Sequence, residues 1–159
     1  MINQIQHSEL DDCLSVIQKS FKGIANEFNL TKENCPAHTS FITMQNLQYH
    51  WDNGYLMYGC YLDEKIIGYV SLEDKGNSEF ELRNLAVLPE YRHKGYGKEI
   101  LDFCKDEMKK LGGSKITIGI IEENTVLKDW YAMNSFIHIG TKRFDHLPFT
   151  VGYMECDVY

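Results

Sequence analysis

One stretch of this chain decides how it folds: LAVLPEYRHKGYGKEIL, residues 85–101. It reads as an apolar strand, a basic turn with two glycines, and the start of an amphipathic helix. The first backbone N–H groups of a helix have no intrahelical acceptor and lie at the positive end of its dipole. Glycines let a ligand approach the backbone closely, and basic side chains add positive charge. The residues concerned are Gly95 and Gly97, with Arg92, Lys94 and Lys98 beside them. The stretch therefore predicts a phosphate site and favours a diphosphate.

The composition is that of a globular protein. With 159 residues, of which 43% are hydrophobic and 25% charged, the chain is long enough to bury a core, and we expect a single domain over residues 1–159. Neither end resembles a signal peptide, and no apolar stretch approaches the roughly 20 residues of a membrane span. The five cysteines form no CxxC pair or Cys/His cluster, which predicts reduced thiols and no metal site. These features favour a cytoplasmic protein with no membrane partner.

The charge balance narrows the class of partner. The net charge of −7 arises from 23 acidic and 16 basic side chains. A general nucleic-acid binder needs a basic face, so the balance argues against nucleic acid as a partner. It favours cationic small molecules, such as amines, over anionic substrates.

The hydrophobic pattern alternates between strand and helix periods. It predicts a short strand within residues 1–6, a helix that begins at Ser8 and gives way to irregular chain at Gly23, and a second helix over residues 43–52. A turn is expected at residues 74–77. Further strands are expected at residues 55–62, 66–72, 79–87, 115–121, 136–143 and 149–157, and further helices from the glycine turn to Gly112 and over residues 124–133. This order predicts an α+β sheet protein rather than a regular βαβ array.

Two common phosphate-binding motifs do not fit the glycine turn. A dinucleotide-binding Rossmann turn needs a third glycine where Ile100 stands, near the start of a parallel sheet. A P-loop needs Gly-Lys followed by Ser or Thr, whereas Gly97 and Lys98 are followed by Glu99.

The pattern Arg92-x-x-Gly95-x-Gly97 instead resembles the acyl-CoA-binding signature of the GNAT N-acetyltransferases. Residues 85–91 look like the family's fourth strand and its exit loop, and the resemblance spans residues 55–153. It implies the GNAT fold, a mixed, mostly antiparallel sheet flanked by helices. A second cofactor motif of the family, Asn…Tyr followed by Gly-Phe, is matched by Asn124, Leu127, Trp130, Tyr131 and Phe136.

One position departs from this second motif. Ser135 stands where the family has glycine, so we expect Asn134 to take the left-handed conformation at that turn.

The resemblance implies acetyl-CoA as co-substrate and no metal. In the family, acetyl-CoA lies in a cleft where the fourth and fifth strands splay apart. The pantetheine arm would pair with the backbone of Leu85, Ala86 and Val87, and the Val87 amide would polarise the thioester carbonyl. The Arg92 side chain would shape the turn. The pyrophosphate would bind the backbone N–H groups of His93, Lys94, Gly95, Tyr96, Gly97 and Lys98.

Two residues of the second motif have alternative roles. Tyr131 matches the family tyrosine whose hydroxyl lies near the CoA sulfur and can protonate the leaving thiolate, although a tyrosine beside Trp130 can equally pack in the core. Asn124 would bind the pantetheine arm, or it would cap the following helix.

The general base that deprotonates the acceptor ammonium has several candidates. Glu81 lies six residues before Val87 on the same strand, where histone-type members carry a glutamate base. A bulge in that strand would change which face Glu81 occupies. Other candidates are Glu73, Glu79, an ordered water relay, and the loop histidines His38 and His146.

The sequence thus predicts an N-acetyltransferase that moves an acetyl group from acetyl-CoA to a primary amine by direct attack in a ternary complex. The acceptor is either a small-molecule amine or a protein or peptide amine. An alternative from another class is a CoA-binding sensor or structural module without catalysis. Members of the family often pair through sheet edges or C-terminal strands, so the resemblance also implies a homodimer.

Overall fold

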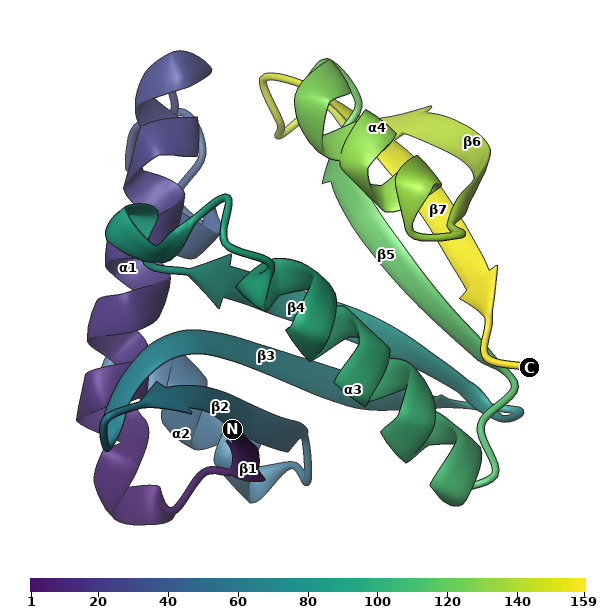
Figure 1. The fold of residues 1–159 in the computed structure, drawn as a ribbon. Coiled ribbons are helices and arrows are strands. Elements are labelled where there is room, and N and C mark those ends of the chain that lie inside the picture. The colour runs from purple at the N-terminus through teal and green to yellow at the C-terminus, as the bar shows by residue number, and fades with distance from the viewer.

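The computed structural model describes all 159 residues and contains one seven-stranded sheet. The strands lie in the order β1-β2-β3-β4-β5-β7-β6 (Figure 1). All neighbouring strands are antiparallel except β4 and β5, which are parallel. The predicted α+β class and mixed, mostly antiparallel sheet are therefore confirmed. The strands are β1 (Ile2–Gln4), β2 (Leu56–Leu62), β3 (Lys65–Gly76), β4 (Glu79–Val87), β5 (Lys115–Ile121), β6 (Ile137–Arg143) and β7 (Thr150–Asp157).

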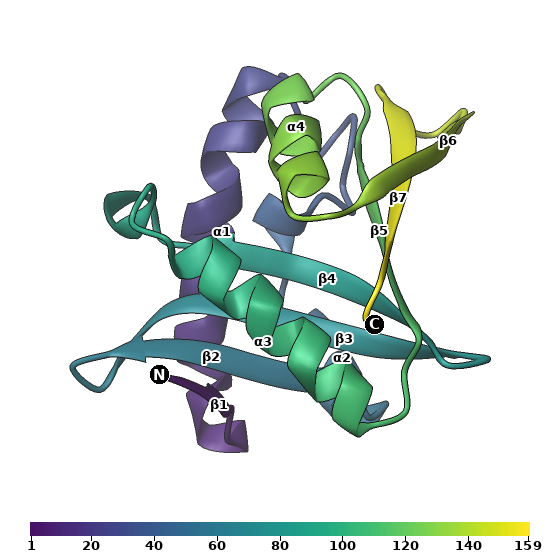
Figure 2. The same cartoon turned by 45° about the vertical axis from the view of Figure 1, so that its right-hand side comes forward.

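Helices flank the sheet on both sides. Helix α3 crosses one face of β2 to β4, and α1 and α2 lie on the opposite face (Figures 1 and 2). Helix α3 turns an apolar stripe, with Ile100 and Cys104 among its buried residues, onto the strands, and its Phe103 packs edge-on against Tyr58 with ring centres 5.0 Å apart. The helices are α1 (Leu10–Glu27), α2 (Met44–Asp52), α3 (Tyr96–Lys110) and α4 (Thr125–Met133).

The sheet opens between its two parallel strands. Pairing of β4 with β5 is limited to Glu79 with Lys115, Phe80 with Ile116 and Glu81 with Thr117. Beyond these pairs the strands diverge, so that β4 and β5 form the V visible in Figure 1. Asn84 takes a left-handed conformation with φ of 55°, and the register of β3 and β4 shifts at this point. The bulge that the sequence left open is thus present in β4.

Two boundaries differ from the predictions by more than two residues. Helix α1 does not end at Gly23 but continues to Glu27. Because Gly23 is exposed it costs only about 1 kcal/mol in the helix, and Ala25 in the following turn is buried against Leu30, Cys35 and Ile121. The turn after β3 is also shorter than predicted: Gly76 still pairs with Glu79, and the left-handed Asn77 and Ser78 form a two-residue hairpin loop.

The turn after α4 corrects another prediction. Ser135, with φ of 73°, takes the left-handed conformation, whereas Asn134 has φ of −102°. Asn134 instead caps the end of α4, because its side-chain amide donates to the Trp130 carbonyl at 2.8 Å and its own carbonyl accepts from Lys105 at 2.7 Å. Both contacts hold Asn134 outside the left-handed region, so the next residue makes the turn.

The cysteines belong to the core. All five are buried and unpaired, as the absence of a spacing motif predicted. No helix is both long and apolar enough to cross a membrane. The expected cytoplasmic location stays a prediction.

Candidate active site

The turn between β4 and α3 presents a row of free backbone N–H groups. No oxygen of the chain accepts from the N–H groups of residues 93–98, and the Glu99 N–H is the first that is bonded, to the Gly95 carbonyl at 3.0 Å. His93 and Gly95 have φ of 61° and 90°, the alternation that gathers successive N–H groups around an anion. The row lies at the N-terminal end of the fifteen-residue helix α3. Such a row suits an anion, and the diphosphate stays a prediction.

Arg92 supports this turn instead of extending into it. Its Nε donates to the Val87 carbonyl at 3.2 Å, and its Nη2 donates to the Ser20 carbonyl in α1. This agrees with the expectation that Arg92 shapes the turn. Of the two lysines, Lys98 is paired with Asp102 at 2.6 Å, and the Lys94 ammonium lies 5.6 Å from the centre of a tyrosine ring in the same loop. The side chains of Arg92, Lys94 and Lys98 contact other groups of the protein. The donors for an anion at this turn are therefore the backbone N–H groups.

The open edge of β4 continues from this turn. Ala86 pairs with Tyr69 of β3, and the Leu88 N–H donates to the Ile67 carbonyl, so these residues are bonded to the sheet. Since backbone groups alternate along a strand, Leu85 and Val87 direct theirs toward β5, which has already diverged. Of the predicted pantetheine contacts, Leu85 and Val87 are available, whereas Ala86 is engaged with β3. The Val87 carbonyl is taken by Arg92, which leaves its N–H free.

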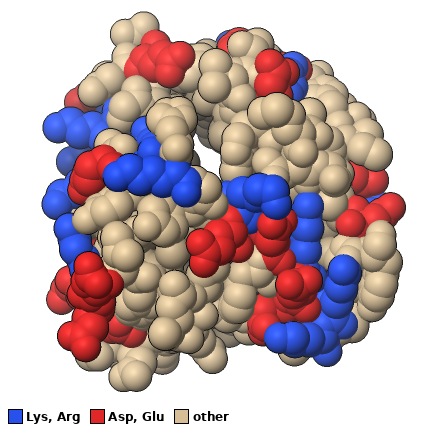
Figure 3. Space-filling model, in the orientation of Figure 1, with Lys and Arg blue, Asp and Glu red and all other residues tan.

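Helix α4 stands directly against the turn. A Cβ on Gly97 would lie only 3.3 Å from the Trp130 ring, so the absence of a side chain at Gly97 lets α3 and α4 approach. The space-filling view shows the surface hollowed between these two parts of the molecule (Figure 3). The structure thus brings the two predicted cofactor motifs together across one cleft.

Tyr131 is buried on α4, with ring centres 4.9 Å from Trp130 and 5.2 Å from Phe136. Its hydroxyl has no hydrogen-bond partner within the protein. It is still reached by solvent, since the two side-chain polar atoms that are both unpartnered and fully buried are His50 Nδ1 and the Tyr69 hydroxyl. Burial raises the pKa of Tyr131 above its usual range. The Tyr131 ring thus packs in the core, which is one of its two predicted roles, and its free hydroxyl remains a proton donor at neutral pH.

Asn124 is the N-cap of α4. Its side-chain oxygen accepts from the Leu127 N–H at 3.2 Å, and the residue is 9% exposed. The capping role is therefore present. The amide NH2 group makes no hydrogen bond within the chain and remains available to a ligand.

Glu81 lies at the vertex of the V, on the last pair that joins β4 to β5. It belongs to a group of ion pairs: its carboxylate lies 3.2 Å from Arg83 Nη2 and 3.7 Å from Lys75 Nζ. Arg83 also donates from Nε to Glu73 at 2.7 Å. Although burial acts to raise the pKa of Glu73, the Arg83 hydrogen bond and charge hold it below its usual range. Glu81 and Glu73 thus share the same two cations, Arg83 and Lys75.

The loop histidines occupy different surroundings. His146 is exposed between β6 and β7, against the Phe144 ring. His38 is half-buried, its Nδ1 accepts from the Ser40 N–H at 3.2 Å, and burial lowers its pKa. Glu79 lies on the first of the β4–β5 pairs, away from the diverging ends.

The sequence missed a cavity on the α2 side of β4. This cavity of about 230 Å³ brings together side chains from the α1–α2 connection, from α2 and from β4. His50, to which the sequence assigned no role, lines it, and no spacing pattern connects His50 with the β4 bulge. Its polar lining residues are His38, Thr39, Asn46, His50, Arg83 and Asn84.

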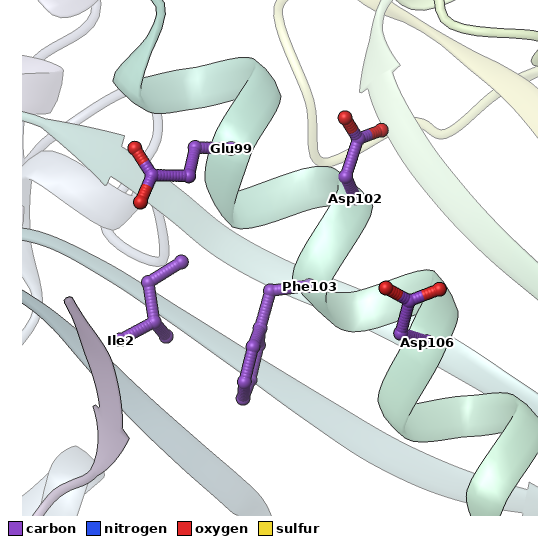
Figure 4. Close-up of a pocket in the computed structure, with 5 residues that line it drawn as sticks. All are labelled: Ile2, Glu99, Asp102, Phe103 and Asp106. Carbon is purple, nitrogen blue, oxygen red and sulfur yellow. The ribbon is translucent and has the colours of Figure 1, made fainter.

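A second, shallow hollow of about 330 Å³ lies between β1 and the outer surface of α3. Figure 4 shows the carboxylates of Glu99, Asp102 and Asp106 along the helix, with Phe103 and Ile2 beside them. The four α3 side chains and Ile2 of β1 lie outside the V of β4 and β5.

Three features occur together: the row of free N–H groups, the open edge of β4 and the second motif on α4. Together they define a protein of the acyl-CoA-binding class. The chain belongs to the acetyltransferase (GNAT) family, whose model matches residues 21–136. The family uses acetyl-CoA.

A curated relative and two solved structures illustrate the likeness. The spermidine N(1)-acetyltransferase of Thermoplasma acidophilum is 33% identical over 81 residues, which are 51% of this chain and 50% of that protein. The chain spans about half the length of the curated relatives it matches. The ribosomal-protein-S18-alanine N-acetyltransferase of Escherichia coli has a TM-score of 0.79 and 16% identity, with 99% of this chain and 93% of that chain covered. The PaiA N-acetyltransferase of Thermoplasma acidophilum, solved with coenzyme A, has a TM-score of 0.77 and 22% identity, with 99% and 98% covered. Both structures share the fold.

Proposed function

We propose that this protein is an acetyl-CoA-dependent N-acetyltransferase that acetylates a primary amine by direct attack in a ternary complex. The observation that carries the proposal is the row of free N–H groups from His93 to Lys98, which continues into the open edge of β4. The row suits a pyrophosphate, and the strand edge suits an extended chain with amide groups, such as pantetheine. Family membership supports the same co-substrate.

The proposed reaction assigns one task to each group. The amine nitrogen bonds to the thioester carbonyl carbon, and the carbon–sulfur bond breaks. The Val87 N–H stabilises the negative charge that develops on the carbonyl oxygen. Glu81 takes the proton that the ammonium must lose before it attacks, and Tyr131 gives a proton to the departing thiolate. No metal takes part.

The observations specify the acceptor amine less closely than the co-substrate. The spermidine N(1)-acetyltransferase acts on a small polyamine and the ribosomal-protein-S18-alanine N-acetyltransferase on a protein alanine, so both classes of amine occur on this fold. A CoA-binding module without catalysis would keep the N–H row but release no thiol from acetyl-CoA. Dimerisation stays a prediction.

Calorimetry with acetyl-CoA tests the proposal first, with NAD and ATP as controls. We expect micromolar binding of acetyl-CoA alone. A panel of amines then follows, with release of free CoA thiol as readout. Binding without thiol release from any amine would favour the non-catalytic module, and equal binding of NAD would overturn the proposed co-substrate.

Glu81→Gln tests the proposed base. Because Gln cannot accept the proton, we expect kcat/KM to fall about 100-fold and the acidic limb of its pH profile to disappear. Glu73→Gln is the matched control, since Glu73 also binds Arg83, and it should keep that limb. Retention of the acidic limb in Glu81→Gln would move the role to another group, such as His146.

Two substitutions of Asn124 separate its two roles. Asn124→Ala removes both the cap and the amide, so we expect a loss of about 1 kcal/mol of stability together with weaker acetyl-CoA binding. Asn124→Asp keeps an oxygen for the Leu127 N–H but loses the NH2 donor. We expect Asn124→Asp to have the same free energy of unfolding as the unmodified protein. We expect it to bind acetyl-CoA about 10-fold more weakly, because a charged oxygen replaces the donor. Full affinity in Asn124→Asp would limit Asn124 to capping.

A further inference from the structure

The cavity beside the β4 bulge is lined by hydrogen-bond donors. Its lining contains no Asp or Glu, which is unexpected for a site that receives a polyamine. Three of its polar side chains, Asn46, Asn84 and His38, have an acceptor atom occupied within the protein while a donor group remains, and the Thr39 hydroxyl gives its own proton to Asn84.

The two asparagines illustrate this pattern. Asn46 Oδ1 accepts from the Thr43 N–H at 2.9 Å, as part of the cap of α2. Asn84 Oδ1 accepts from the Thr39 hydroxyl at 3.3 Å. Each amide therefore has its NH2 group left over for a ligand.

The two histidines are also donors. His38 Nδ1 accepts from the Ser40 N–H, so the neutral ring carries its proton on Nε2. His50 stacks on Tyr55 with ring centres 4.4 Å apart, and its Nδ1 is sealed without a partner. Because Nδ1 is sealed, Nε2 is the ring nitrogen through which His50 can donate to a ligand, in the tautomer that carries the proton there.

Arg83 completes the set. Its guanidinium donates to Glu73 and Glu81, and further N–H groups remain. Lys75 joins the same ion pairs, so two cations balance two carboxylates. The cavity's preference therefore arises from its converging donors and not from net charge.

We propose that this cavity binds a carboxylate of the acceptor, so that the substrate is an amine that also carries a carboxylate, and not a polyamine. The inference rests on the proposed function for its amine end. A carboxylate has only acceptor atoms and suits such a lining. A strand rises about 3.3 Å per residue, which puts Asn84 about 10 Å from Val87 along β4. One small molecule can therefore reach from the cavity toward the thioester site.

Binding of product-like ligands tests the inference without turnover. The probes are N-acetylglycine and N-acetyl-β-alanine, each compared with its carboxamide, and the readout is the set of histidine ring-proton resonances. We expect saturable shifts with at least one acid and binding at least 10-fold weaker for its carboxamide. Equal binding of acid and carboxamide, or no saturable binding of either acid, would overturn the inference.

Two isosteric variants each replace a hydrogen-bond donor of the cavity lining with an acceptor. Asn84→Asp and Asn46→Asp each keep the oxygen that the protein uses and replace the free NH2 with a charged oxygen, and Asp tolerates the left-handed φ at position 84. We expect each to weaken binding of the acid at least 10-fold. Gln45→Glu adds the same charge at an exposed position of α2 outside the cavity and should change nothing. Unchanged binding in both Asp variants would overturn the inference.

Turnover separates this inference from the proposed function. If free amino acids and polyamines are acetylated equally well, and acetyl-CoA binds, the function stands and the carboxylate site is wrong. If acetyl-CoA does not bind, the function fails, while the acid probes still report on the cavity.

Discussion

Gly95→Val should abolish measurable acetyl-CoA binding while the protein remains folded. Gly95 has φ of 90°, a conformation that costs an L-residue about 1–2 kcal/mol and a β-branched one more. The turn would relax to negative φ, and the N–H groups around it would no longer converge. We expect the affinity for acetyl-CoA to fall more than about 100-fold, equivalent to some 2.7 kcal/mol, by calorimetry.

Gly112→Val is the matched control. Gly112 follows the other end of α3 with φ of 77°, and a Cβ at either glycine would meet nothing within 4 Å. Both variants should therefore lose similar stability through backbone strain. Only Gly95→Val should lose acetyl-CoA binding. If both bind acetyl-CoA normally, the N–H row is not the pyrophosphate site.

Tyr131→Phe should lower kcat by about 100-fold, the order that a positioned proton donor contributes, with little change in acetyl-CoA affinity. The ring packs between Trp130 and Phe136, and Phe preserves that packing. The hydroxyl makes no hydrogen bond within the protein, so its removal should leave stability nearly unchanged. Steady-state thiol release and thermal unfolding measure the two effects separately.

Tyr58→Phe provides the comparison for this variant. Tyr58 is also buried, and burial raises its pKa to about 12, but it lies under α3 against Phe103. Loss of that hydroxyl should leave kcat unchanged. A normal kcat in Tyr131→Phe would leave Tyr131 a packing residue and assign protonation of the thiolate to solvent.

Local patterns predicted most of the elements. The strands at residues 79–87 and 115–121 have their predicted bounds, because their apolar residues alternate and turn residues flank them. The prediction for α1 was wrong beyond Gly23, since the burial of Ala25 against Cys35 outweighs one exposed glycine. The prediction for the turn after α4 was wrong because Lys105, on another helix, holds the Asn134 carbonyl. In both cases a distant contact overrode the local preference.

The sequence by itself determined the row of free N–H groups. A strand, a glycine turn and a helix are contiguous in the chain, and they leave the N–H groups of residues 93–98 unpaired wherever the rest of the protein lies. The tertiary structure alone decided which neighbours this site has. The limited pairing of β4 with β5, the approach of Trp130 to Gly97, and the cavity joining His50 to Asn84 depend on strand register, a bulge and helix packing. These contacts join residues far apart in the chain, and no local spacing encodes them.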